Sequence, residues 1–171
     1  YMSNLTHLFL DDNELKAASA QYLGYSKYLQ NLQMLSLKNN RIENDGFRYL
    51  MVSDNFGALR HLSVEYNKVT EEGIDCLTDS KFFSNLAHFD IQQNEIGDTG
   101  AQIISTCVMR NLRFMNLKHN GIGELGYKCL SESENMPLLQ TLHIYPGNNA
   151  PMEAKKSLMR NKYLRSLNTV M

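Results

Sequence analysis

The sequence predicts an α/β solenoid, in which a strand and a helix recur along the whole chain. Three observations lead to this fold class: a unit of constant length, apolar positions at fixed offsets within it, and an asparagine that returns at one offset. The spacings between units are 27, 27, 27, 26 and 27 residues. The units begin at Leu5, Leu32, Leu59, Leu86, Leu112 and Leu139. Such units cannot bury their apolar faces alone and become stable by stacking.

Each unit opens with a predicted strand. Apolar residues occupy offsets 0, 3, 5 and 10, which are Leu86, Phe89, Ile91 and Ile96 in the fourth unit. Offsets 3 and 5 lie on one face of an extended strand, because successive side chains alternate between its two faces. We therefore expect this face to be buried.

An asparagine recurs at offset 8, where the chain turns away from the strand. Its side-chain amide can donate to and accept from backbone groups that a tight inward turn would otherwise bury unpaired. The asparagines form a predicted structural ladder, which is Asn13, Asn40, Asn67, Asn94 and Asn120. This pattern indicates a structural role and not an active site.

A predicted helix follows each turn. Six residues after each asparagine stands a small residue, and four residues later an apolar one, which suits a helix packed closely behind the strand. The pairs are Ser19 and Leu23, Gly46 and Leu50, Gly73 and Leu77, Gly100 and Ile104, and Gly126 and Leu130. Asn44, Thr70 and Asp98 stand at the starts of these segments and are predicted helix caps.

The sixth unit departs from the pattern. Tyr145-Pro146-Gly147-Asn148-Asn149 replaces the usual turn, and proline is at home near a sheet edge because it cannot donate a ladder hydrogen bond. A helix is expected from about Met152 to Arg160. Leu164 and Leu167 then restart the motif, as a terminal cap or as the first strand of another repeat. We expect a single domain over residues 1–171, and its abrupt opening into a repeat favours a fragment of a longer protein.

The pattern Leu-x-x-Leu-x-Leu-x-x-Asn-x-Leu, followed by a glycine and a full helix, resembles the leucine-rich repeat family, and in particular its ribonuclease-inhibitor-like class. The resemblance covers nearly the whole chain. It implies a horseshoe arc with a parallel sheet on the concave face and helices on the convex face. Members of similar appearance include cytosolic inhibitors, sensor-protein tails, actin pointed-end caps, Ran GTPase activators and bacterial effectors that enter host cells, so the class serves many partners.

Composition narrows the functional classes. The 171 residues are 43% hydrophobic and 20% charged with a formal net charge of −1, which argues against a disordered chain and against an overall basic nucleic-acid binder. The sequence contains no apolar run long enough for a membrane span and no signal peptide in its first residues. Cys76, Cys107 and Cys129 lack the spacing of a disulfide framework or a zinc cluster. These features favour a cytoplasmic protein, or one in the host cytosol if it is a secreted effector.

The predicted concave face carries the side chains at offsets 2, 4 and 6, joined by offset 7 at its rim. Histidines and aromatic residues gather there, and rigid aromatic side chains in a polar setting are typical of binding hot spots. The alternative interpretation is that strand propensity alone places aromatic residues on a sheet surface. The predicted partner-binding residues are Phe9, Met34, His61, Tyr66, His88, Asp90, Phe114, Lys118, His119 and His143.

Catalysis and metal binding are the competing site hypotheses. The cysteines belong to predicted outer segments and the histidines to inner strands, which argues against a Cys–His pair. His61, His88 and Asp90 share neighbouring strands, but alternate side chains on one strand lie nearly 7 Å apart, a distance that strains a compact tetrahedral metal site. We therefore expect neither an enzyme nor a cofactor or metal.

The sequence thus predicts a protein-interaction module that binds a protein partner on its concave face, as a scaffold or a host-directed effector. Mixed, slightly acidic concave charges disfavour nucleic acid, and neither a membrane nor a small-molecule substrate is expected. Two alternatives stay open: a regulator of an enzyme such as a small GTPase, and a purely structural spacer or cap in a larger chain.

Overall fold

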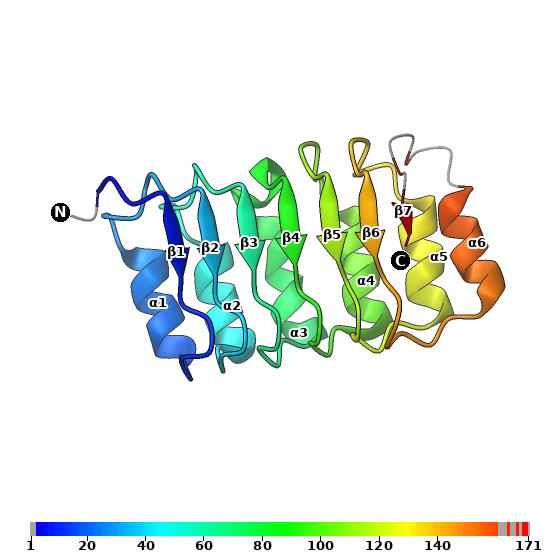
Figure 1. The fold of residues 1–171 in the computed structure, drawn as a ribbon, viewed down its shortest axis with the longest axis horizontal. Helices are drawn as coiled ribbons and strands as arrows, with labels where there is room; N and C mark the ends of the chain where they lie inside the picture. Colours follow the sequence, from blue (N-terminus) through cyan, green and yellow to red (C-terminus); the bar gives the residue numbers. More distant parts are fainter. Residues whose placement is uncertain (1–2, 161–163, 165–166, 168, 171) are drawn as a thin grey trace.

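The computed structural model describes residues 3–160, 164, 167 and 169–170, and these form one parallel sheet of seven short strands. The strands lie side by side in chain order (Figure 1). Because the repeats have nearly equal length, equal offsets pair: His7 with Met34, Met34 with His61, and His61 with His88. The strands are β1 (His7–Phe9), β2 (Met34–Ser36), β3 (His61–Ser63), β4 (His88–Asp90), β5 (Phe114–Asn116), β6 (Thr141–His143) and β7 (Thr169–Val170).

Helices cover one face of this sheet and leave the other face open (Figure 1). The α-helices are α1 (Ala17–Tyr25), α2 (Glu43–Met51), α3 (Glu71–Ile74), α4 (Gly97–Thr106), α5 (Glu124–Glu132) and α6 (Met152–Met159). Two short 3₁₀ helices are η1 (Asp75–Asp79) and η2 (Phe83–Asn85). The predicted leucine-rich repeat solenoid is confirmed, with the sheet on the concave face and the helices on the convex face.

The core lies between the sheet and the helices. In the fourth repeat, Leu86, Phe89, Ile91 and Ile96 are all fully buried, as their offsets predict. In the first repeat the four leucines at the same offsets are only partly buried, because no described repeat stacks on their outer side. Fully burying one such side chain contributes about 1.5 to 3 kcal/mol. Stacking therefore supplies much of each repeat's stability.

The third repeat lacks the full helix that the sequence predicts. Its α-helix ends at Ile74, and the chain continues as 3₁₀ helix through the predicted helical residue Leu77. Phenylalanines fill the space behind the sheet instead. The Phe56 and Phe82 rings meet edge-on at 5.8 Å, and the Phe83 and Phe89 rings at 5.1 Å.

The predicted helix caps are only partly correct. Thr70 does cap α3, because its hydroxyl accepts a backbone N–H of the first turn at 3.3 Å. Asn44 and Asp98 lie inside α2 and α4 and do not cap them. Each reaches the next repeat: the Asn44 carbonyl oxygen accepts from Thr70 N at 2.8 Å, and Asp98 accepts from Gly123 N and Gly126 N at 2.7 and 2.8 Å. These side chains therefore stabilise the start of the following helix.

The asparagine ladder joins neighbouring repeats. Asn94 is 5% exposed, and its amide donates to Val64 O in the preceding repeat and to Ile91 O and Gln92 O in its own. Asn40, Asn67 and Asn120 are buried in the same way. Asn13 is exposed, and its amide donates to Asp11 O alone among the residues described.

The sixth repeat also has a ladder asparagine, which the sequence reading missed. Asn148 is 6% exposed and donates to Leu117 O at 2.8 Å and to Ile144 O at 2.6 Å. One extra residue in the turn shifts it from offset 8 to offset 9. Gly147, with φ +84, leaves room for this turn because a Cβ there would collide with the His119 ring.

The turns after the strands alternate between two forms. Each of the first five turns has one left-handed residue at offset 7 and a second one whose place alternates. In the first, third and fifth repeats this second residue stands at offset 9, with φ of 53, 59 and 69 for Glu14, Lys68 and Gly121. In the second and fourth repeats it stands at offset 11, with φ of 56 and 58 for Glu43 and Gly97. The solenoid is therefore built from two kinds of joint between neighbouring repeats.

The ladder hydrogen bonds follow this alternation. The side-chain oxygens of Asn40, Asn94 and Asn148 each accept two backbone N–H groups from the preceding repeat. The Asn67 oxygen accepts one, at 3.3 Å. The buried Asn120 oxygen has no hydrogen-bond partner within the part of the chain that is described. The ladder side chains of the second, fourth and sixth repeats thus accept more backbone hydrogen bonds from the preceding repeat than those of the third and fifth.

At the C-terminal end, the predicted helix is α6, and the restarted motif forms a strand. Thr169 pairs in parallel with Thr141 of β6. Leu164 is buried and Leu167 packs against the core. Residues 161–163, 165–166, 168 and 171, which the sequence reading assigned to this unit, lie outside the described residues.

Candidate functional site

A row of rings crosses the concave face. Because offset 2 of one strand lies beside offset 2 of the next, His61, His88 and Phe114 stand next to one another on β3, β4 and β5. Ring centroids are 5.6 Å apart for His61 and His88, and 4.1 Å for His88 and Phe114, which stack with a 10° interplanar angle. Phe114 also meets His143 of β6 edge-on at 4.9 Å. The structure therefore brings together four of the predicted partner-binding residues.

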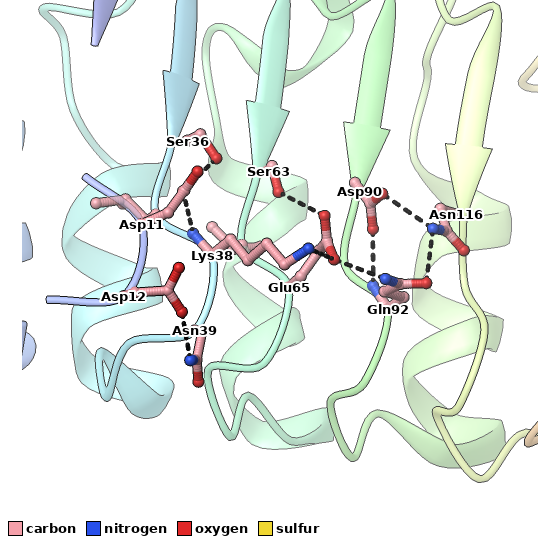
Figure 2. Close-up of polar contacts among 12 residues, drawn as sticks. Asp11, Asp12, Ser36, Lys38, Asn39, Ser63, Glu65, Asp90, Gln92 and Asn116 are labelled. Atoms are coloured by element: carbon pink, nitrogen blue, oxygen red, sulfur yellow. Dashed lines mark hydrogen bonds and ion pairs between the residues drawn. The ribbon is translucent and has the colours of Figure 1, made fainter. Parts of the chain in front are cut away.

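A polar network runs beside this ring row, toward the ends of the strands (Figure 2). Lys38 forms an ion pair with Glu65 at 3.3 Å, and Gln92 donates to the same Glu65 carboxylate at 2.6 Å. Asn116 donates to Gln92 at 3.0 Å. At the other end, the Asp11 carboxylate accepts from Lys38 N at 2.9 Å. These contacts hold the charged side chains of successive repeats in fixed positions.

The sequence predicts that the Asp90 side chain is free on the concave surface, but the structure contradicts this prediction. The residue is 8% exposed, and each carboxylate oxygen accepts a hydrogen bond: one from Gln92 N at 3.1 Å and one from the Asn116 amide at 2.9 Å. Asn116 is itself 5% exposed. The two short side chains cover each other on neighbouring strands, so Asp90 lies beneath the exposed surface of the site.

Burial sets the acid–base properties of the face. It raises the pKa of the Asp90 carboxyl to about 6, because the charged form loses hydration. Burial also lowers the pKa of His88 below its ordinary value, and the positive charge of a protonated His61 would lower it further. The pKa of His143 is lowered by burial and by Lys118. The carboxylate of Glu65 raises the pKa of Lys38.

The remaining predicted residues lie around this centre. Phe9, 60% exposed, stands at the N-terminal end of the face, next to half-buried Met34. Tyr66 (44% exposed) and His119 stand at the rim, in turns with φ of 52 and 53. Lys118 is half-buried beyond the ring row. Left-handed backbone is uncommon for a bulky residue such as tyrosine.

Four polar residues of the concave face belong to the site but are absent from the predicted partner-binding residues. They stand at offsets 4 and 6 and are Ser36, Glu65, Gln92 and Asn116. Their signal was available: donors and acceptors stand at offsets 4 and 6 of consecutive repeats, so their side chains meet across the sheet.

A hollow of about 550 Å³ lies over β1 to β4 on the concave face. It forms because Ser36 and Ser63, the last residues of β2 and β3, are small, whereas Phe9 and Asp90 flank them on β1 and β4. The hollow is further lined by Asp11, Met34, Leu35, Lys38, His61, Leu62, Glu65 and His88.

The cysteines lie away from these residues, as predicted. Cys76 belongs to η1, Cys129 to α5, and Cys107 ends α4, whereas His61 and His88 stand on strands. Burial raises the pKa of both Cys76 and Cys107 to about 11. Their thiols therefore stay protonated near neutral pH, which makes them poor nucleophiles.

We expect Zn²⁺ at low micromolar concentration to leave the melting temperature unchanged. The His61 and His88 rings are tilted by 48° to each other, and the described residues contain no group of three His, Cys, Asp or Glu side chains that could hold a metal ion. A ligand that binds only the folded state must raise its stability by mass action, so a melting curve with and without Zn²⁺ tests the site. A clear rise that His88→Ala removes would contradict this prediction.

Comparisons with known proteins agree with the fold. A family model described as a leucine-rich repeat matches residues 84–105. Among solved structures, a leucine-rich repeat protein of Leptospira interrogans is similar, with 20% sequence identity, a TM-score of 0.59, and alignment over 98% of this chain. No curated protein matches the sequence. The chain therefore has the leucine-rich repeat fold, with one repeat matched by the family model, while the ribonuclease-inhibitor-like class stays a prediction.

The aligned region corresponds to 37% of the length of the Leptospira structure. Among the described helices, none has both the length and the hydrophobicity that a membrane span requires.

Proposed function

We propose that this chain is a protein-interaction module, used as a scaffold or a host-directed effector, and that its protein partner binds the concave face. Leucine-rich repeat domains generally mediate protein–protein interactions. The observation that carries the proposal is the ring row of His61, His88, Phe114 and His143, which stands on the face that the described helices leave open.

The chemistry of this face supports a protein partner. Rings in a polar setting supply contact area at a low cost in side-chain entropy, which is the composition of binding hot spots. Ion pairs and hydrogen bonds hold the neighbouring polar side chains in place, so little order has to be gained on binding. The three cysteines are free, which supports a reducing, cytoplasmic location, or the host cytosol for an effector.

The double substitution Tyr66→Ala and Phe114→Ala should weaken partner binding by about 2 kcal/mol or more, roughly 30-fold in Kd. Tyr66 offers exposed ring surface, and Phe114 anchors the ring row. The partner is first isolated by affinity capture, and Kd is then measured by calorimetry. Loss of the Phe114 stacking contacts should cost only about 1 kcal/mol of folding stability.

Tyr22→Ala is the matched control, because Tyr22 is 77% exposed and lies on α1 on the convex side. We expect this variant to bind the partner as wild type does. Full-strength binding by the double variant, together with loss of binding by Tyr22→Ala, would show that the partner docks elsewhere.

A further inference from the structure

The hollow over β1 to β4 has an apolar wall and an acidic floor. Its wall is formed by Phe9, Met34 and the His61 ring, at offsets 2 and 4 of their repeats. Its floor is formed at offset 6, where Asp11 and Glu65 stand on either side of Lys38. Four residues along a strand span roughly 13 Å. This distance suits a long side chain that has an apolar stem and a polar head.

The floor carries more negative than positive charge. Of the side chains that line the hollow, Asp11, Glu65 and Asp90 are acidic and Lys38 is the one Lys or Arg, so the formal charge is −3 + 1 = −2 with the histidines neutral. The Lys38 ammonium is already paired with Glu65, whose side chain is 12% exposed. One oxygen of Asp11 accepts from Lys38 N and the Ser36 hydroxyl. With Lys38 counted, the hollow thus keeps a net negative charge.

The surroundings of Asp90 are also short of positive charge. The residue is 8% exposed, its carboxylate accepts hydrogen bonds from two amide donors, and it forms no ion pair among the described residues. Burial without a cation is what raises its pKa to about 6. A cation placed in the hollow would stabilise the ionised form.

We propose that this hollow receives a basic side chain of the protein partner, with its stem against Phe9, Met34 and His61 and its charged head among Asp11, Glu65 and Asp90. The inference rests on the proposed function and specifies the chemistry of the partner. Lysine and arginine side chains bury their methylene stems along apolar surface while their heads stay polar. A cation beside the exposed Phe9 ring gains further attraction.

The site is pH-dependent in a defined direction. Protonation of Asp90 removes a negative charge from the hollow, and protonation of His88 adds a positive one, so both events oppose a bound cation. Affinity for a cation therefore falls as the pH drops through about 6 and is full above 7. The charged and titratable groups that face Asp90 and the two rings are Asp11, Lys38 and Glu65 in the hollow, and His143 beyond the ring row.

End-blocked tripeptides test the proposal without the partner. Acetyl-Leu-Arg-Leu-amide is titrated into the ¹⁵N-labelled protein, and the amide shifts of Ser36, Lys38, Ser63 and Glu65 are followed. We expect saturable shifts at these residues, with binding at least about tenfold tighter than for acetyl-Leu-Gln-Leu-amide. The affinity for the arginine peptide should fall about tenfold between pH 7 and pH 5. Equal binding of the two peptides, or shifts confined to the helices, would overturn the proposal.

Glu65→Gln removes one charge of the floor and keeps the shape of the side chain and one of its acceptor oxygens. It should weaken the arginine peptide about tenfold, whereas Glu132→Gln, an exposed substitution on α5, should leave it unchanged. Equal affinity for the wild type and Glu65→Gln would contradict an acidic floor.

If the Tyr66/Phe114 double variant loses the partner but the arginine peptide does not bind, this inference fails alone. If the peptide binds but the double variant keeps its partner, the proposed function fails instead.

Discussion

Asn94→Ala should lower the free energy of unfolding by about 3 kcal/mol. The Asn94 side chain makes five hydrogen bonds at the centre of the ladder, and all of them join it to backbone groups. Its oxygen accepts from Asn67 N and Val69 N, and alanine would leave these buried donors without a partner. Each unsatisfied buried group costs about 1 to 3 kcal/mol. Denaturant unfolding midpoints with a common m value measure the loss.

Two other ladder positions provide graded controls. Asn120→Ala should cost less than Asn94→Ala, about 1 to 2 kcal/mol, because the Asn120 oxygen accepts no hydrogen bond from the described residues. Asn13→Ala should cost less again, since Asn13 is exposed and its amide makes one backbone hydrogen bond. Equal losses at all three positions would contradict the alternation of the joints.

The general architecture follows from the sequence because it depends on spacing alone. A repeat of 26 or 27 residues places equal offsets side by side, and the offsets then decide which side chains face the core and which face the open sheet. The registers of His61 with His88 and of His88 with Phe114 follow in this way. The alternation of the turns did not follow, because it lies in backbone angles and Glu14 and Glu43 are not left-handed turn residues by type.

Asp98 and Asn148 show a second limit of sequence reading. Cap residues are recognised by their place before their own helix, but Asp98 bonds to the start of the next one. The ladder asparagine is recognised at a fixed offset, but one inserted residue moves Asn148 out of it. Both assignments depend on which repeat lies beside the residue, which local patterns do not contain.

The candidate site was predicted in its location and partly in its chemistry. The pattern of offsets placed Phe9, Tyr66 and Phe114 on the concave face, where they do lie. It could not show that Asp90 and Asn116 bury each other, because burial on an open sheet depends on how far the neighbouring side chains extend above it. The hollow has the same origin, since the side chains of Ser36 and Ser63 are shorter than those around them.

The third repeat shows a compensation that periodicity alone does not reveal. Gly73 and Leu77 have the spacing of a full helix, yet the α-helix spans only Glu71–Ile74. Bulky rings from η2 and the segment before it occupy the volume that a longer helix would fill. Phe82 and Phe83 are 1% and 2% exposed. The stability of this repeat should therefore depend on those rings.

Phe83→Ala should lower the free energy of unfolding by about 3 to 5 kcal/mol, the largest loss we expect from a single substitution here. Phe83 is 2% exposed and packs edge-on against Phe89 of the central strand β4, so its removal leaves a cavity behind the sheet. Phe9→Ala removes the same ring from a position that is 60% exposed. It should change stability by less than about 0.5 kcal/mol. Denaturant unfolding of both variants measures the difference, and similar losses would mean that the phenylalanine packing does not support the third repeat.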